Sequence, residues 1–155
     1  MNAITNTQIT DIVVDIFERT CFLIADEIEN DDIAHFQSQI KWSSKIKYSG
    51  THEGEIFVDA SDGFLQELAS CMLGVGTDEV DLEEEGVQAC REITNIIAGS
   101  IILSIGGDHD EYKLGLPEKG TITRTGIGAE CYLASSCGVV HVHWHPQVGE
   151  IEKAA

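Results

Sequence analysis

Residues 90–99 read CREITNIIAG and lie within a longer apolar run that ends at Ile105. Asparagine is a poor helix former, because its short amide competes for the hydrogen bonds that a helical backbone needs. Nevertheless, Asn95 stands in the middle of the most hydrophobic helix that the sequence predicts, one turn after Glu92. The run therefore predicts a long core helix over about residues 82–105, and its polar positions need an explanation.

The spacing of the apolar residues gives this helix two different sides. At about 100° per residue, the predicted core face carries Val87, Cys90, Ile93, Ile97, Ile101 and Ile105. The opposite side, which we call the polar stripe, consists of Gln88, Glu92, Asn95 and Gly99. The glycine leaves one turn bare, so that another surface can approach closely there. By itself, a Glu-x-x-Asn pair is also what the solvated side of any amphipathic helix presents, and it does not establish a function.

The segments before this helix predict two more helices and a hairpin. Apolar residues recur at helical spacing over residues 9–24, and a serine or aspartate cap followed by an apolar stripe and a glycine predicts a second helix over 61–74. Between them, alternating apolar residues in 36–50 and in 55–61 predict strands that pair as an antiparallel hairpin. The helix over 9–24 and the helix over 82–105 are the two long ones.

Residues 111–146 are rich in β-branched and aromatic residues and are punctuated by glycine and proline, so we expect two or three further strands there. Paired strands, then helices, then strands again indicate an α+β fold, with a mainly antiparallel sheet covered by helices. The length and composition of residues 1–155 are those of one domain with its own core.

The charge of the chain limits its partners and its location. The chain has 27 acidic and 9 basic side chains and a net charge of -18, which repels nucleic-acid phosphates and anionic lipid alike. The five cysteines are scattered and form no Cys-x-x-Cys pair, as expected of reduced thiols. The amino terminus lacks the pattern of a secretion signal, and the apolar run is too short to span a bilayer. We expect a cytoplasmic protein that binds neither nucleic acid nor membrane.

A series of short motifs surrounds the polar stripe. In order, the chain carries GEIFVDAS at 54–61, Met72-Leu73-Gly74, acids between 78 and 85, Glu92-Ile93-Thr94-Asn95, Ala98-Gly99 and Pro117. This order and spacing resembles the CheC, CheX and FliY family of chemotaxis phosphatases, and its single-domain CheX-like branch in particular. The resemblance covers about residues 54–117. It departs at Gln88, where the family usually has aspartate or serine, and in the first helix, which offers only Glu18-Arg19-Thr20-Cys21 in place of a second Glu-x-x-Asn.

The resemblance implies a CheC-like fold and one active site per chain, which hydrolyses the aspartyl phosphate of a CheY-type response regulator. Asn95 would hold the attacking water, Glu92 would pair with a lysine of the receiver domain, and Gln88 and Gly99 would lie against the partner. The receiver would supply Mg²⁺, so the chain would need no cofactor of its own. The resemblance also implies a homodimer. The alternative is a non-catalytic adaptor that docks on a receiver or another signalling protein through the same helix, and Gln88 favours it.

The histidines of HVHWH, which are His141, His143 and His145, project from one face if the segment is a strand. Three imidazoles on one face could bind zinc, copper or nickel. However, same-face neighbours along a strand lie about 6.6 Å apart, and the sequence shows no carboxylate or cysteine that would complete a site. We therefore expect a polar sheet face or a dimer contact here, with metal binding as the weaker alternative.

Overall fold

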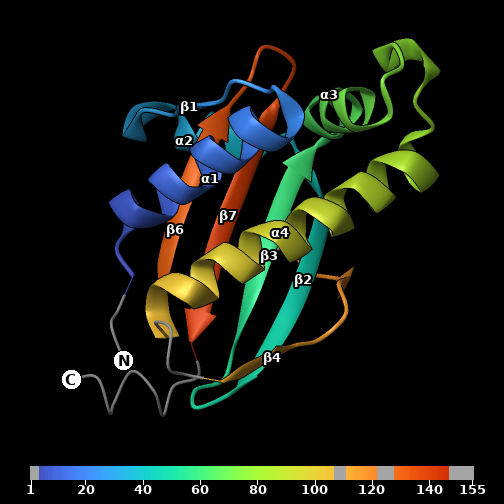
Figure 1. Cartoon of the computed structure of the whole chain (residues 1–155). Coiled ribbons are helices and arrows are strands. Elements are labelled where there is room, and N and C mark those ends of the chain that lie inside the picture. The colour runs from blue at the N-terminus through green and yellow to red at the C-terminus, as the bar shows by residue number, and fades with distance from the viewer. Residues whose placement is uncertain (1–3, 107–110, 122–127, 147–155) are drawn as a thin grey trace.

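The computed structural model describes residues 4–106, 111–121 and 128–146 (Figure 1). Its helices are α1 (Asn6–Cys21), α2 (Ile33–Gln37), α3 (Asp62–Leu73) and α4 (Val87–Gly106), with shorter helical turns η1 (Asn30–Asp32), η2 (Thr77–Glu79) and η3 (Leu82–Gly86). Its strands are β1 (Asp26–Glu27), β2 (Ile40–Gly50), β3 (Gly54–Ser61), β4 (Tyr112–Leu114), β5 (Glu118–Lys119), β6 (Ala129–Ala134) and β7 (Val139–Pro146). The predicted α+β class is confirmed.

The strands form one antiparallel sheet with the order β1-β6-β7-β3-β2-β4, and β5 pairs with β2 beside β4. The predicted hairpin is confirmed as β2 and β3, with Ile46 opposite Ile56. The centre of the sheet joins distant parts of the sequence, because β3 also pairs with β7. Helices α1 and α4 cross one face of this sheet side by side, and α3 lies at the end of β3 (Figure 1).

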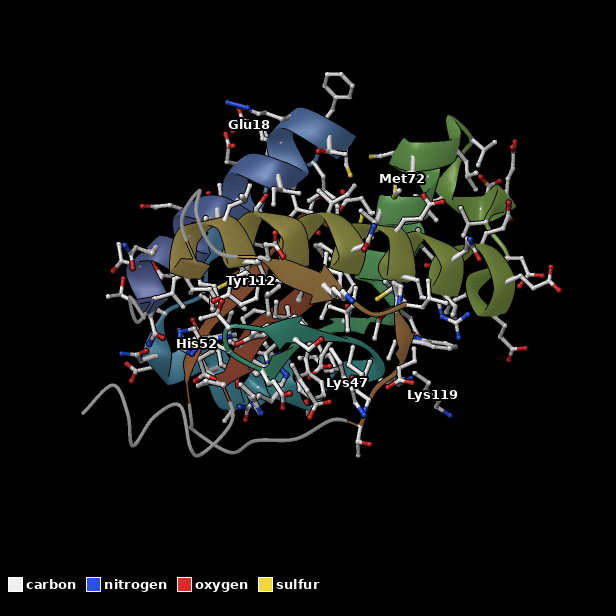
Figure 2. The ribbon with its side chains drawn as sticks, turned by 60° about the horizontal axis from the view of Figure 1, so that its bottom comes forward. Glu18, Lys47, His52, Met72, Tyr112 and Lys119 are labelled. Atoms are coloured by element: carbon white, nitrogen blue, oxygen red, sulfur yellow. The ribbon has the colours of Figure 1, made fainter. Side chains whose placement is uncertain are left out.

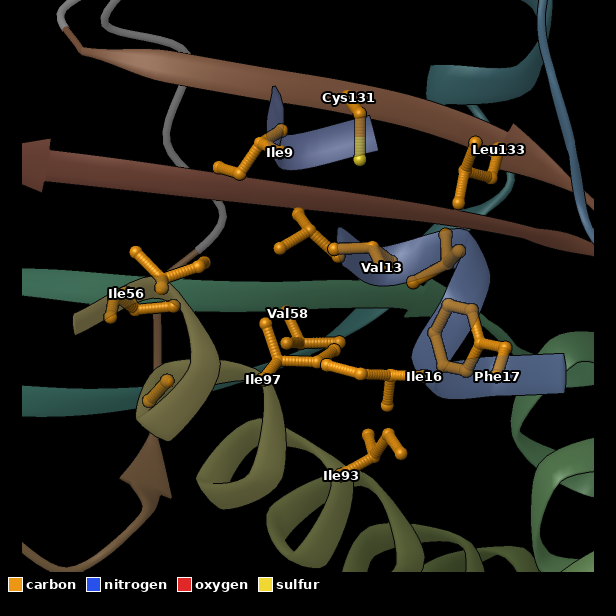
Figure 3. Close-up of a cluster of buried hydrophobic side chains, with 14 of the residues drawn as sticks. Ile9, Val13, Ile16, Phe17, Ile56, Val58, Ile93, Ile97, Cys131 and Leu133 are labelled. Carbon is orange, nitrogen blue, oxygen red and sulfur yellow. The ribbon is translucent and has the colours of Figure 1, made fainter. Parts of the chain in front are cut away.

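The main core lies between the helices and this face of the sheet (Figure 3), and α1, α3 and α4 contribute most of the largest buried side chains. Phe17 of α1 meets Phe64 of α3 edge to face, with ring centroids 5.2 Å apart. Ile93 and Ile97 of α4 are fully buried in the same cluster. The predicted core face of α4 is confirmed at every position except Val87, which is only half-buried.

Two helix ends differ from the sequence prediction. Helix α1 begins after Thr5, which forms a capping box with Gln8, and ends three residues earlier than expected. Phe22 takes a left-handed conformation with φ 53° and ends the helix, so Ile24 is 72% exposed and does not belong to the apolar stripe. Helix α3 agrees with its prediction, because Ser61 caps its start and Gly74 ends it.

The acidic linker before α4 has a local structural role. The side chain of Asp81 accepts hydrogen bonds from the backbone of Glu83 and Glu84, and the backbone of Asp81 donates to Glu85 at 2.9 Å. These acids therefore start the helical segment Leu82–Gly106, close to the predicted bounds. In the described residues this is the one helix long and apolar enough to cross a membrane by length and composition, but half of its most apolar stretch is buried. It is the core helix of the fold.

The other face of the sheet is partly covered by α2. The strand predicted over 36–50 is wrong at its start, because residues 36 and 37 belong to this helix and β2 begins at Ile40. Ile33 and Phe36 pack with Tyr132 and Val139 in a second, smaller apolar cluster. The side chain of Gln37 also donates a hydrogen bond of 2.8 Å to the Tyr132 hydroxyl. Figure 2 shows the two sides of the molecule, with Glu18 and Met72 among the helices and Lys47 and Lys119 toward the sheet.

Candidate functional site

The polar stripe lies on the outer side of α4. Gln88, Glu92 and Asn95 are exposed, whereas their neighbours Cys90 and Ile93 are buried. Within residues 4–106, 111–121 and 128–146, the side chains of Glu92 and Asn95 make no hydrogen bond or ion pair. Both polar groups are therefore free to interact with another molecule.

The helix that carries the stripe is held firmly. Helix α4 packs on α1, α3, β2 and β3, so its core side has little freedom to shift. At Gly99, a Cβ atom would meet no other atom within 4 Å. The bare turn that the sequence predicted is thus open space, and a partner backbone or side chain can approach the helix there.

A shallow hollow of about 280 Å³ adjoins the start of the stripe. It lies between the end of α3 and the beginning of α4, and Leu73, Gln88 and Glu92 are among its lining residues. Two apolar side chains near the stripe are exposed, Leu73 to 50% and Ile96 to 38%. Apolar side chains beside free polar groups are typical of a surface that binds another protein.

A model of the family described as chemotaxis phosphatase CheX matches residues 42–143. This chain belongs to the CheX family. The match includes β3, α3, α4 and the polar stripe, and it extends beyond the segment that carried the sequence resemblance. Comparison with curated protein sequences yields no match.

Solved structures of chemotaxis proteins share the fold of this CheX-family chain. CheX from Vibrio vulnificus is 16% identical, with a TM-score of 0.70 over 90% of this chain and 93% of that one. CheX from Borrelia burgdorferi, in a complex described as CheX-CheY-BeF3-Mg+2, is 15% identical, with a TM-score of 0.61 over 89% and 94%. FliY from Thermotoga maritima is 13% identical, with a TM-score of 0.59 over 96% and 93%. At these identities the similarity establishes the fold.

A larger cavity of about 540 Å³ lies on another flank of α4, against β2 and β5. Trp42, Ser44, Cys90 and Arg91 are among its lining residues, and no member of the polar stripe reaches it. Burial raises the pKa of the Cys90 thiol to about 12, so this thiol is not a nucleophile at neutral pH. The cavity is therefore separate from the candidate active surface of this CheX-family protein.

The burial of the cysteines leads to a simple prediction. Cys71 and Cys137 are exposed, whereas Cys21, Cys90 and Cys131 are buried, and burial raises the pKa of the Cys21 thiol to about 11 and of the Cys131 thiol to about 12. We expect two thiols to react with Ellman's reagent in the native protein at pH 8, and all five only after unfolding in guanidinium. Rapid reaction of a third thiol in the native state would contradict the buried position of Cys21 in α1, Cys90 in α4 or Cys131 in β6.

The three histidines of β7 lie on the sheet face that α1 and α4 do not cover, as the alternation predicted. They belong to a stack of aromatic rings in which Tyr132 lies on His141, His141 on His143, and His143 on Phe57, with centroids 3.9, 4.3 and 4.6 Å apart. His141 and His143 are buried, with exposures of 4% and 1%. The sheet face is polar here, as expected, but these two side chains are buried and not open to solvent.

Carboxylates do accompany these histidines, contrary to the sequence expectation. His143 Nε2 donates to Asp59 Oδ2 at 3.0 Å, and His141 Nδ1 lies 3.8 Å from the same oxygen. His141 Nε2 also bonds Glu130 Oε2 at 2.9 Å. Asp59 was not predicted from the sequence. Alternation in β3 points this side chain away from the face of Val58 and Ala60, and the pairing of Asp59 with His141 of β7 then brings it among the histidines.

The electrostatics of the cluster follow from these contacts. Burial would raise the pKa of Asp59, but the nearby His141 imidazole and the hydrogen bond from His143 outweigh it and lower that pKa. Burial also opposes the charge of His141, but Asp59 and Glu130 raise its pKa. For His143, burial prevails and lowers the pKa. The cluster thus holds two carboxylates, one imidazole that favours its charged form and one that favours its neutral form.

Proposed function

We propose that this protein hydrolyses the aspartyl phosphate of a CheY-type response regulator in chemotaxis or related two-component signalling. The observation that carries the proposal is the pair Glu92 and Asn95, which stand exposed and unbonded on the core helix of a CheX-family fold. The similar protein from Borrelia burgdorferi has been crystallised with CheY, BeF3 and Mg²⁺, which supports a receiver domain as the partner class.

The chemistry requires little from the phosphatase. An acyl phosphate is already reactive, so a catalyst needs mainly to place a water in line with phosphorus while positive charge stabilises the phosphoryl oxygens. In this proposal the receiver supplies that charge through its own Mg²⁺ and lysine. The mechanism requires no nucleophile, metal or cofactor from this chain.

Asn95 has the properties that water positioning requires. Its uncharged amide can both donate and accept a hydrogen bond, whereas a carboxylate at this position would repel the phosphoryl group. Its position on a packed helix fixes the distance that it can reach into a partner's pocket. Asparagine lowers the stability of a helix by only about 0.5 kcal/mol relative to a good helix former. In this proposal the amide is retained because it contacts the partner.

Glu92 lies one turn before Asn95, on the same exposed side, and can pair with the receiver's lysine. Such a pair would set the register in which Asn95 enters the receiver. Gln88 extends the contact into the hollow beside Leu73. The net charge of -18 favours approach to a pocket that contains a lysine and a cation, and it agrees with a cytoplasmic protein that avoids nucleic acid and membranes.

Replacing Gly99 with alanine is expected to separate fold stability from activity. Since nothing contacts this position, the added methyl group should stabilise α4 by up to about 1 kcal/mol. The same methyl group would occupy space that the receiver needs, so we expect receiver dephosphorylation to slow several-fold. Thermal unfolding and phosphoreceiver decay measure the two effects. A stabilised variant with unchanged activity would show that the partner does not approach Gly99.

The direct test measures the decay of a phosphorylated CheY-type receiver in Mg²⁺, alone and with catalytic amounts of this protein. We expect decay to become faster in proportion to the protein added.

The second candidate function is a non-catalytic adaptor of the same fold, and Gln88 at the position usually held by aspartate or serine favours it. An adaptor would bind the phosphorylated receiver and leave its lifetime unchanged. The homodimer also stays a prediction, and sedimentation equilibrium tests it.

A further inference from the structure

We propose that Asp59, His141 and His143 bind one divalent transition-metal ion, with Zn²⁺ as the ion to test. The three ligand atoms come from two neighbouring strands, because Asp59 of β3 is paired directly with His141 of β7. The proposal is independent of receiver dephosphorylation, since the cluster and the polar stripe lie on opposite sides of the sheet.

The donor atoms are spaced as a zinc ion needs. Around a tetrahedral zinc with bonds of about 2.0 to 2.1 Å, neighbouring ligand atoms lie roughly 3.3 Å apart. Here Asp59 Oδ2 lies 3.0 Å from His143 Nε2 and 3.8 Å from His141 Nδ1, and one ligand atom from each of the three residues lies within 4.8 Å of the other two. These distances are close to those around one ion, and one ring must tilt so that both imidazole lone pairs point at it.

Each imidazole also has a partner on its other nitrogen. His141 Nε2 bonds Glu130 at 2.9 Å, and His143 Nδ1 bonds His145 Nε2 at 2.7 Å. Histidines that bind metals almost always donate their second ring nitrogen to such a partner, which orients the ring and increases its basicity. With an ion at Nε2 of His143, its proton would reside on Nδ1 and be donated to His145.

The surroundings restrain the two imidazole ligands and keep them out of solvent. The rings of His141 and His143 are held between Tyr132 and Phe57 and lie within 10° of parallel, so one ring must tilt for an ion to lie in both ring planes. Asp59 Oδ1 is fully buried and accepts no hydrogen bond of normal geometry from a described residue, although the Ser43 hydroxyl helps to lower the pKa of this group. A buried, unsatisfied carboxylate oxygen gains from a cation, and Oδ1 would be the fourth ligand atom of an ion that Asp59 holds through both oxygens. Such an ion would connect the two central strands and would be inaccessible to substrate.

The test uses untagged full-length protein, dialysed against a chelator and titrated with Zn²⁺ in a calorimeter. An excess of Mg²⁺ in the buffer occupies the many surface carboxylates. We expect one Zn²⁺ per chain, with loss of this binding in Asp59→Asn and in His143→Gln. Glu130→Gln, which removes a partner of a ligand, is expected to weaken binding about tenfold. His52→Gln, on a histidine outside the cluster, is the matched control and should bind as wild type does.

A second measurement needs no variant and therefore holds even if the substitutions prevent folding. Co²⁺ bound to wild-type protein in four-coordinate geometry gives strong visible absorption, and competition with Zn²⁺ should remove it. Absence of stoichiometric Zn²⁺ binding would overturn the proposal. So would binding that Asp59→Asn and His143→Gln leave unchanged, or a weak Co²⁺ spectrum typical of six-coordinate surface binding.

Discussion

The variant Asn95→Ala is expected to accelerate receiver dephosphorylation about 100-fold less than wild-type protein does. Loss of the amide leaves the attacking water unheld, and small misplacements of a reacting group cost about this factor. The fold should be unaffected, since Asn95 is exposed and alanine is the better helix former. Decay of the phosphorylated receiver under catalytic amounts of each variant measures the effect.

The control for this experiment is Ser104→Ala, an exposed polar residue on the same helix whose hydroxyl donates to the Ser100 carbonyl. We expect it to retain full activity. Binding of the phosphorylated receiver should also persist in Asn95→Ala, because the proposal assigns register to Glu92. If Asn95→Ala dephosphorylates the receiver as fast as wild type, the water-positioning role is wrong. If the wild-type protein binds the phosphorylated receiver but does not dephosphorylate it, the protein is an adaptor.

Phe17→Ala is expected to lower the free energy of unfolding by about 3–5 kcal/mol. Phe17 is fully buried and links α1 to α3 through its edge contact with Phe64, so truncation leaves a cavity between two helices and the sheet. Small domains have only about 5–15 kcal/mol of stability in total. Guanidinium unfolding, followed by circular dichroism, measures the change.

Phe22→Ala is the matched control, because it removes the same side chain five residues further along. Phe22 is 88% exposed, so we expect a change within about 0.5 kcal/mol. Equal losses at Phe17 and Phe22 would contradict the position of α1 on the sheet. A small loss at both would show that α1 contributes little to the core.

The sequence predicts the three longer helices of this fold better than helix α2 and the short strands. The apolar period of α4 and the Ser61 cap of α3 are local signals, and the structure agrees with them. Helix α1 ends early because Phe22 adopts a left-handed conformation. This conformation can be expected from the sequence at a glycine, but not at a phenylalanine. Strands β1 and β5 have two residues each, and pairing with distant strands rather than local preference determines them.

The two candidate sites differ in how far sequence reasoning could reach. The polar stripe lies on one helix, so helical spacing was enough to bring Glu92 and Asn95 together. The cluster around Asp59 joins β3 to β7, and no local spacing reveals that pairing. The histidine face was predicted, but its carboxylate partners required the strand order.

The pairing of β3 with β7 also determines how this chain must fold. Asp59 and His143 are 84 positions apart, yet they lie against each other in the centre of the sheet. The chain between β3 and β7, which includes α3 and α4, forms a long loop that must close before these two strands can pair. Closing such a long loop slows folding. Until β7 is in place, one edge of β3 lacks its partner and can pair with a strand of another molecule. We therefore expect the slowest folding step, and the greatest tendency to aggregate, to coincide with the docking of the β6–β7 hairpin.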